Sequence, residues 1–263
     1  MRNASVGFHC PSCASVSPID KRTQRKLRSF TGDPITTRAL IALNALAFIW
    51  ILISGGSVSS GGGSSTLDYG LVGFGRIREA SQLIDVGVAE GEWWRLITSA
   101  FLHAGLLHFA VNMYLLWVLG QQLERLHGRS RYLGLYFGSL AAGSLGGMLL
   151  DPTALTVGAS GAVFGLMSAT FIHQKRRGIS PWRSGIGGLL ILNLIFTFGR
   201  SGISIGGHLG GLLGGAFLAW AIEEIDRKRL NRNLGLAVIT TFTLLCLVAG
   251  IWAGNRWYDP VLG

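Results

Sequence analysis

Charged residues are scarce in this chain. They make up 14% of its 263 residues, whereas a soluble domain typically carries roughly 25%. Long apolar blocks take their place, and the mean hydropathy of the chain is +0.44. This composition excludes an ordinary soluble domain and predicts a polytopic membrane protein with one membrane-embedded body.

Cysteine is also rare, with three residues in the whole chain. Cys246 lies in an apolar run, where a buried thiol without a special role is expected. His9, Cys10 and Cys13 form half of a zinc-ribbon spacing, but a structural zinc takes four ligands and no second Cys-x-x-Cys pair follows. We therefore predict at most an incomplete or intermolecular zinc site here, and we expect no other cofactor.

The apolar runs define the expected organisation of the chain. The first 38 residues contain no such run, so we expect a cytoplasmic segment without a cleavable signal peptide. Seven membrane-spanning helices are predicted, at 39–54, 101–120, 131–150, 160–174, 185–200, 205–222 and 234–254. The expected regions are an N-terminal segment 1–38, an all-α six-helix membrane core 39–224 with a first external loop 55–100, and a basic loop plus C-terminal transmembrane helix 225–263.

The formal net charge of +10 reflects 23 basic and 13 acidic residues. Most of the basic residues fall in the N-terminal segment and in the loops after the second, fourth and sixth expected spans. By the positive-inside rule, this distribution predicts a plasma-membrane protein with a cytoplasmic N-terminus and an external C-terminus. The charge is then explained by topology, and we expect no nucleic-acid partner.

Ser160 stands between glycines at the start of the fourth expected span. Such a serine suits close helix packing and nucleophilic attack equally well. Three further polar side chains stand out inside expected spans, where such groups are costly and usually functional: His108, Asn112 and His208. Counting about 1.5 Å per residue from the basic ends of the spans predicts a similar height for all four, in the outer half of the membrane.

This layer holds the groups that a serine hydrolase needs. His208 can accept the proton of Ser160, because a serine hydroxyl is a poor nucleophile without an adjacent base. His108 and Asn112, four residues apart on one helix face, can donate to an oxyanion together with the Ser160 N–H. No acidic residue lies near His208 in the sequence, so a Ser–His dyad is predicted, with Phe164 packed on the His208 ring.

Other interpretations of the same side chains remain open from the sequence. Ser160 alone is compatible with simple packing, and His108 with Asn112 is compatible with hydrogen bonding between helices. Glu124 is expected to cap a helix or to pair with Arg125 or Arg129. Other polar or aromatic residues are expected near the membrane surfaces, outside the catalytic layer: Trp93, Trp94, His103, His127 and His173.

Several short motifs resemble the rhomboid family of intramembrane serine proteases. They occur in the family's order and extend over residues 93–211. Each motif is weak alone, but the ordered set is specific. The motifs are Trp94-Arg95, His108-x-x-x-Asn112, Glu124-x-x-x-Gly128, Gly158-x-Ser160-Gly161 and Gly207-His208-Leu209-Gly210-Gly211.

The resemblance implies roles for these residues. Ser160 would be the nucleophile and His208 the general base, while His108 and Asn112 would stabilise the oxyanion. Supporting roles would fall to Gly158, Gly161, Phe164, Trp94, Arg95, Glu124 and Gly128. The fifth helix would gate lateral entry of membrane-anchored protein substrates, which would be cleaved in or near their transmembrane segments without a cofactor.

The chain departs from one family pattern, and two rival functions stay open. Some bacterial rhomboids begin with a zinc-binding segment containing several Cys/His pairs, of which only His9, Cys10 and Cys13 are present here. One rival is a non-catalytic rhomboid-like protein that binds transmembrane helices, although such relatives lose the serine or the histidine. The other is a small transporter, which predicts repeated halves that this sequence lacks.

Overall fold

The computed structural model describes residues 2–3, 8–9, 33–79 and 82–256. The chain divides into two units, Met1–Asp33 and Pro34–Gly263. In the first unit, β1 (Arg2–Asn3) pairs antiparallel with β2 (Phe8–His9). Cys10 and Cys13 lie outside the described residues, so the incomplete zinc site stays a prediction.

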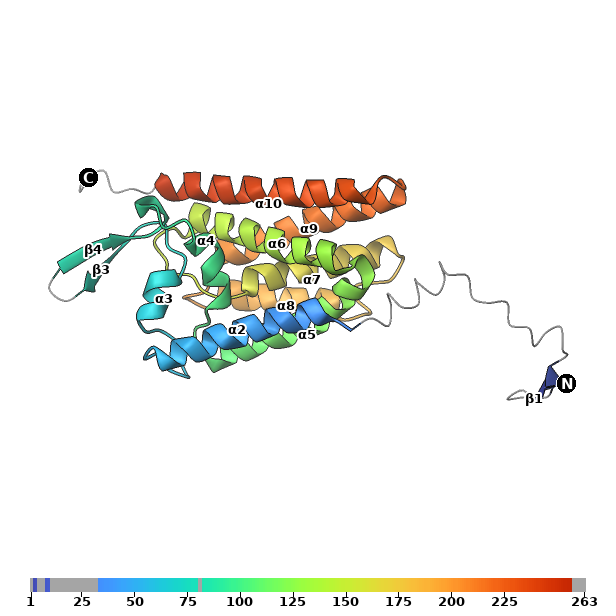
Figure 1. Ribbon diagram of the computed structural model, residues 1–263, viewed down its shortest axis with the longest axis horizontal. Coiled ribbons are helices and arrows are strands. Elements are labelled where there is room, and N and C mark those ends of the chain that lie inside the picture. The colour runs from blue at the N-terminus through green and yellow to red at the C-terminus, as the bar shows by residue number, and fades with distance from the viewer. Residues whose placement is uncertain (1, 4–7, 10–32, 80–81, 257–263) are drawn as a thin grey trace. The chain divides into compact units, whose positions relative to one another are not determined.

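The second unit is a helical bundle (Figure 1). Its long helices are α2 (Ile35–Ile53), α5 (Leu106–His127), α6 (Arg129–Leu150), α7 (Ser160–Arg176), α8 (Ile186–Gly199), α9 (Ile205–Arg227) and α10 (Arg232–Asn255). The loop between α2 and α5 holds α3 (Ser64–Tyr69), a hairpin of β3 (Gly75–Glu79) and β4 (Gln82–Val86), the turn η1 (Val88–Glu90), α4 (Arg95–Thr98) and η2 (Ser99–Phe101). The all-α prediction is confirmed, with the hairpin as a minor addition.

The observed helices agree with most of the predicted membrane spans, but two of them are shorter than a typical span. Among the described residues, α2, α6, α9 and α10 are long and apolar enough to cross a membrane, and α5 qualifies together with the segment Arg95–Phe101, bent by 95°. The multi-pass prediction is therefore confirmed. However, α8 has 14 residues and α7 has 17, so neither meets the length of a full span. Helix α7 packs against α5, α6, α8 and α9, and it therefore needs little lipid-facing apolar surface.

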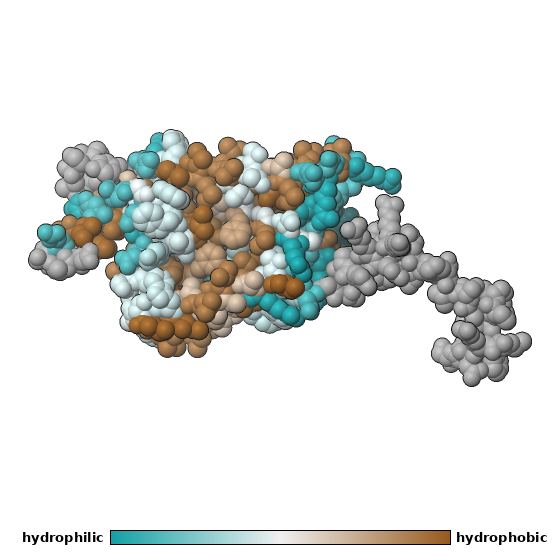
Figure 2. Space-filling model, in the orientation of Figure 1, coloured by the Kyte–Doolittle hydropathy of each residue, from teal (hydrophilic) through white to brown (hydrophobic). Residues whose placement is uncertain are grey.

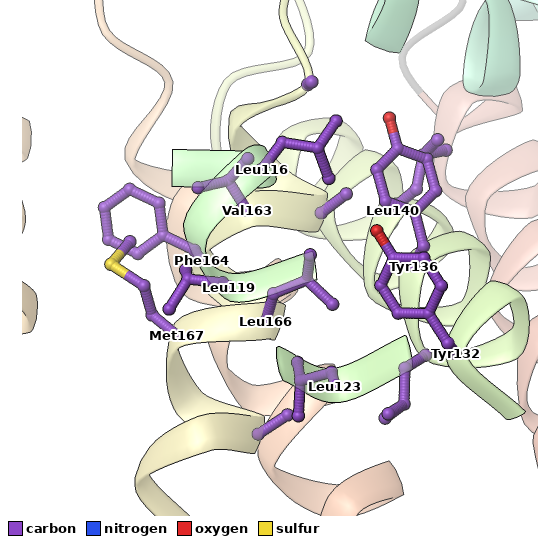
Figure 3. Packing of buried hydrophobic residues seen from close by; sticks show 14 of the residues in the cluster. Leu116, Leu119, Leu123, Tyr132, Tyr136, Leu140, Val163, Phe164, Leu166 and Met167 are labelled. Atoms are coloured by element: carbon purple, nitrogen blue, oxygen red, sulfur yellow. The ribbon is translucent and has the colours of Figure 1, made fainter. Parts of the chain in front are cut away.

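Side chains of α5, α6 and α7 build the central core of the bundle. Leu116, Tyr136 and Leu166 are fully buried and lie close together in Figure 3. Outside this core, hydrophobic side chains cover the middle of the visible face, while hydrophilic ones gather toward one end (Figure 2). Leu213 on α9 and Val248 on α10 are examples of exposed apolar side chains. Such a band is what a bilayer requires of a membrane-embedded surface.

Close contact between α7 and α9 depends on paired glycines. A Cβ on Gly211 would overlap the carbonyl oxygen of Gly161, and a Cβ on Gly215 would overlap the backbone of Gly165. Small residues at these positions let two helix backbones approach each other directly. The contact brings the helix that carries Ser160 against the helix that carries His208.

Glu124, in the last turn of α5, caps the start of α2. Its carboxylate accepts hydrogen bonds from the backbone N–H of Thr36 at 2.9 Å, and from both the backbone N–H and the hydroxyl of Thr37 at 2.8 Å. Arg129 lies 3.9 Å from the same carboxylate. The expected capping role is thus observed, but the capped helix is distant in sequence. Capping of this kind typically stabilises by about 1 kcal/mol.

Arg95 is fully buried and organises the loop between α2 and α5. Its guanidinium donates to the carbonyl oxygens of Leu67 and Gly70, at 2.6 and 2.8 Å, and to the Glu92 carboxylate at 2.7 Å. Arg95 therefore cross-links separate segments of this loop.

Candidate active site

Ser160 and His208 meet across the α7–α9 contact. Ser160 is the first residue of α7, and His208 lies in the first turn of α9. The Ser160 Oγ is 2.8 Å from His208 Nε2, which is an ordinary hydrogen-bond distance. Both side chains are half-buried. The predicted proximity of Ser160 and His208 is thus observed, and these two side chains can exchange a proton directly.

The second nitrogen of His208 contacts a residue that the sequence did not single out. Its Nδ1 lies 2.7 Å from the hydroxyl oxygen of Thr197 on α8, and that hydroxyl donates to the Asn193 carbonyl oxygen at 2.8 Å. Because Thr197 has a single hydroxyl hydrogen, Nδ1 must donate to Thr197 in this arrangement. Nε2 is then left as the acceptor for the Ser160 hydroxyl.

The ring of His208 is also held by an aromatic side chain. Phe164, one turn after Ser160, stacks on it with a centroid distance of 4.2 Å and an interplanar angle of 21°. The expected packing is observed. Stacking fixes the ring plane, while the two hydrogen bonds fix its rotation within that plane.

His108 faces the serine across a gap left by Gly158. A Cβ on Gly158 would lie 2.6 to 2.9 Å from the His108 ring and 3.6 Å from Ser160 Oγ. The φ angle of Gly158 is +126°, which a residue with a side chain adopts only with strain. The His108 Nδ1 accepts the N–H of Ala104 at 3.3 Å, so Nε2 carries the hydrogen. That hydrogen points to the Gly158 side of the ring.

Asn112 lies one turn further along α5 and is buried. Its side-chain amide donates one hydrogen bond to the His108 carbonyl oxygen at 2.9 Å. An amide nitrogen has two hydrogens, so one remains for another acceptor. His108, Asn112 and Ser160 all line one cavity of about 910 Å³, which His208 and Thr197 also line.

Hydrogen bonds from loop residues hold the first turns of α7 and α9 in position. The backbone of Leu71 exchanges two hydrogen bonds with that of Thr156, and the Gly158 N–H donates to the Ser99 carbonyl oxygen at 2.9 Å. At α9, Ser204 caps the helix by accepting the Gly207 N–H at 3.0 Å. The Asp151 carboxylate in turn accepts the Ser204 hydroxyl at 3.1 Å. Asp151 and Ser204 therefore position the turn that holds His208.

His103 corrects one expectation from the sequence, that it lies apart from the proposed catalytic residues. It is 1% exposed, and its ring packs edge-on against that of His108 with centroids 5.3 Å apart. The segment after η2 turns inward before α5 begins, and Gly105 at a φ of +90° allows that turn. His103 thus supports the ring of His108.

Comparison with known proteins shows the family of this chain. Residues 90–224, about half of the chain, match the family model for the Rhomboid domain. The chain therefore belongs to the rhomboid family, a family of multi-pass membrane proteins. It resembles rhomboid protease GluP of Bacillus subtilis (strain 168), at 36% identity over 238 residues, which cover 88% of this chain and 43% of that protein.

Two other relatives show the range of the family. Rhomboid-like protease 3 of Toxoplasma gondii is 35% identical over 141 residues, covering 51% of this chain and 53% of the relative. Inactive rhomboid protein 1 of Homo sapiens is 32% identical over 167 residues, covering 61% of this chain and 20% of the relative. The chain thus spans about half or less of the length of these three relatives.

Proposed function

We propose that this chain is an intramembrane serine endopeptidase that cleaves membrane-anchored proteins in or near their transmembrane segments. The observation that carries the proposal is the 2.8 Å contact between Ser160 Oγ and His208 Nε2 in a cavity of the helical bundle. Similarity to rhomboid proteases from two organisms supports it.

The proposed reaction begins with attack by Ser160 Oγ on the scissile carbonyl carbon. As the C–O bond forms, the hydroxyl proton moves to His208 Nε2, and the carbonyl electron pair moves to oxygen. His208 then gives this proton to the amine nitrogen as the C–N bond breaks. The acyl group remains as an ester on Ser160, and a water molecule, activated by His208, hydrolyses it.

The oxyanion needs hydrogen-bond donors beside Ser160. His108 Nε2–H and the free Asn112 amide hydrogen are two candidates from α5. The Ser160 N–H is the third, because the first N–H groups of a helix have no partner within it and the helix dipole favours negative charge there. The space left by Gly158 lies between the His108 ring and Ser160 Oγ, and it is the natural position for the substrate carbonyl.

The substrate is proposed to enter from the side of α8. This helix is the shortest of the long helices, and it exposes Leu192, Ile195 and Phe196 to the exterior. A helical substrate must unwind locally, because a carbonyl bonded within a helix is not open to attack. We therefore expect small or helix-breaking residues near the scissile bond.

The proposed topology puts the catalytic layer near the outer face of the plasma membrane. It rests on the concentration of basic residues in the N-terminal segment and in the loops on the same side as the C-terminal ends of α5, α7 and α9. Water for the hydrolysis of the acyl-enzyme would then enter from outside.

A second candidate is a binding protein without catalysis, and the match to an inactive rhomboid protein favours testing it. Fluorophosphonate labelling separates the two functions. A protease is expected to form one covalent adduct per chain in detergent, mapped to Ser160 by peptide mass spectrometry and absent from Ser160→Ala. A chain that remains unlabelled while binding transmembrane helices would support the second candidate instead.

A further inference from the structure

The same three helices that carry the active-site groups bring a second set of side chains together at their other ends. His127 is the last residue of α5, His173 lies in the last turn of α7, and Glu223 lies near the end of α9. One nitrogen or oxygen ligand atom from each lies within 4.8 Å of the other two. The proposed mechanism uses none of these groups.

This cluster is far from the catalytic layer. Thirteen helical residues separate Ser160 from His173, which corresponds to about 20 Å along α7. Fifteen residues separate His208 from Glu223, or about 22 Å along α9. The cluster is therefore a site of its own, at the opposite end of the bundle.

Hydrogen bonds within the cluster do not satisfy all of its buried polar atoms. His173 Nδ1 lies 2.5 Å from Glu223 Oε1, and the His127 and His173 rings meet edge-on with centroids 5.6 Å apart. His127 is 6% exposed, and its Nε2 is buried without a hydrogen-bond partner among the described residues. A buried polar nitrogen without a partner is costly, typically about 1–3 kcal/mol, unless something binds it.

We propose that His127, His173 and Glu223 form a binding site for a divalent transition metal of the zinc class. Two imidazoles and one carboxylate are a ligand set that suits Zn²⁺, and they leave a fourth position for water. Ligands of a tetrahedral zinc lie about 3.3 Å apart, given metal–ligand distances near 2.0–2.1 Å. The observed ligand atoms are within 4.8 Å of one another, and His173 Nδ1 and Glu223 Oε1, at 2.5 Å, would have to move about 0.8 Å apart to bind one zinc ion.

The helix ends at this position favour a cation, whereas the nearby side chains are mixed in charge. Three helices end here, and the carbonyl ends of helices carry partial negative charge. Arg131 and Asp226 pair with each other at 2.8 Å, Arg177 lies near Glu223, and the Arg232 guanidinium donates to the His127 carbonyl oxygen at 2.8 Å. Within the cluster, the Glu223 carboxylate supplies the negative charge that a bound metal can balance.

A metal here would join α5, α7 and α9 at the end opposite Ser160. Its effect would be to hold the helix ends together, and thereby to stabilise the core. The site uses no residue from the N-terminal segment, so it is distinct from the partial ligand set His9, Cys10 and Cys13.

Cobalt titration tests this proposal directly. The full chain, purified in detergent without a polyhistidine tag and stripped of metal, would carry His9→Ala, Cys10→Ser and Cys13→Ser to remove the N-terminal ligands. In this background we expect one Co²⁺ per chain, visible d–d absorption without a thiolate charge-transfer band, and displacement by Zn²⁺. A saturating metal concentration should raise Tm by about 5 °C.

Variants identify the ligands. His127→Gln removes a ring nitrogen that has no hydrogen-bond partner, so the chain should fold and yet lose at least 10-fold in Co²⁺ affinity. Glu223→Gln should lose at least as much, whereas the matched control Glu224→Gln alters the adjacent carboxylate, which pairs instead with Arg227, and should bind as the background does. Absence of cobalt uptake in the background, or unchanged affinity in both His127→Gln and Glu223→Gln, would overturn the proposal.

Discussion

The hydroxyl of Thr197 lies 2.7 Å from His208 Nδ1, on the side of the ring opposite Ser160. Thr197 occupies the place that a carboxylate takes in a Ser-His-Asp triad, where the third residue holds the imidazole in its productive tautomer. Here the third group is neutral and belongs to α8. A displacement of α8 would therefore release His208 Nδ1, which links the position of that helix to the orientation of the proposed base.

Two substitutions of Thr197 should distinguish a role in orienting His208 from a role in packing. Thr197→Val keeps the shape of the side chain but removes the oxygen that accepts from Nδ1. We expect kcat for a membrane-anchored substrate to fall by about 10- to 100-fold, with KM nearly unchanged, because the lost interaction orients the base and does not contact substrate. Thr197→Ser restores the oxygen and should recover most of kcat. Equal losses in the valine and serine variants would refute the positioning role.

The space beside Gly158 gives a second prediction. Gly158→Ala would place a methyl group 2.6 to 2.9 Å from the His108 ring, on a backbone with φ of +126°. We expect a loss of stability of about 1–3 kcal/mol from backbone strain, together with a fall in cleavage of more than about 100-fold. Thermal unfolding and cleavage should be measured on the same sample.

A suitable control for this change is Gly178→Ala. Gly178 also has a positive φ, +73°, but a Cβ there meets no other atom within 4 Å. Gly178→Ala should have backbone strain similar to that of Gly158→Ala, but it should retain cleavage at temperatures where it is folded. If both variants lost activity alike, blockage of the carbonyl position would not be the cause.

The two α5 donors should contribute unequally. His108 Nε2–H faces the gap beside Ser160, whereas Asn112 already gives one amide hydrogen to the His108 carbonyl oxygen. Removal of one oxyanion donor typically lowers kcat by about 100- to 1,000-fold. We expect His108→Ala to fall in this range and Asn112→Ala to lose less. Steady-state kinetics that showed changes in KM alone would argue for substrate binding instead.

Glu124 should matter for stability rather than for chemistry. Glu124→Ala leaves the N–H groups of Thr36 and Thr37 without their carboxylate, at the start of α2. We expect a loss of about 1–3 kcal/mol in unfolding free energy and a lower Tm, with the cleavage rate per folded molecule unchanged. The exposed Glu90→Ala is a useful comparison, since it should change neither quantity. Loss of cleavage by folded Glu124→Ala would require a catalytic role.

The relative positions of Ser160, His208 and Phe164 could be predicted from the sequence because they follow from regular helix geometry. Helix rise is constant, so counting from basic helix ends sets the depth of a side chain, and one turn relates Ser160 to Phe164. The catalytic roles of Ser160 and His208 stay proposals.

Other parts of the site depend on contacts that no local pattern records. Thr197 is one hydroxyl in an apolar helix, and its contact with His208 depends on the approach of α8 to α9. His103 was expected near the membrane surface, apart from the catalytic residues, but the segment before α5 turns it inward against His108. His127 was likewise expected near the membrane surface, and its burial against His173 could not be predicted from the sequence. In each case, the partner lies on another element of the bundle.

The most direct test of the central claim is cleavage of a membrane-anchored model substrate by the purified protein reconstituted in liposomes. The wild type should release a fragment cut in or near the transmembrane segment. Ser160→Ala and His208→Ala should each reduce the rate by at least about 1,000-fold, and the double variant should be scarcely slower than either, because the two residues act as one unit. Cleavage by Ser160→Ala at the wild-type rate would contradict the account.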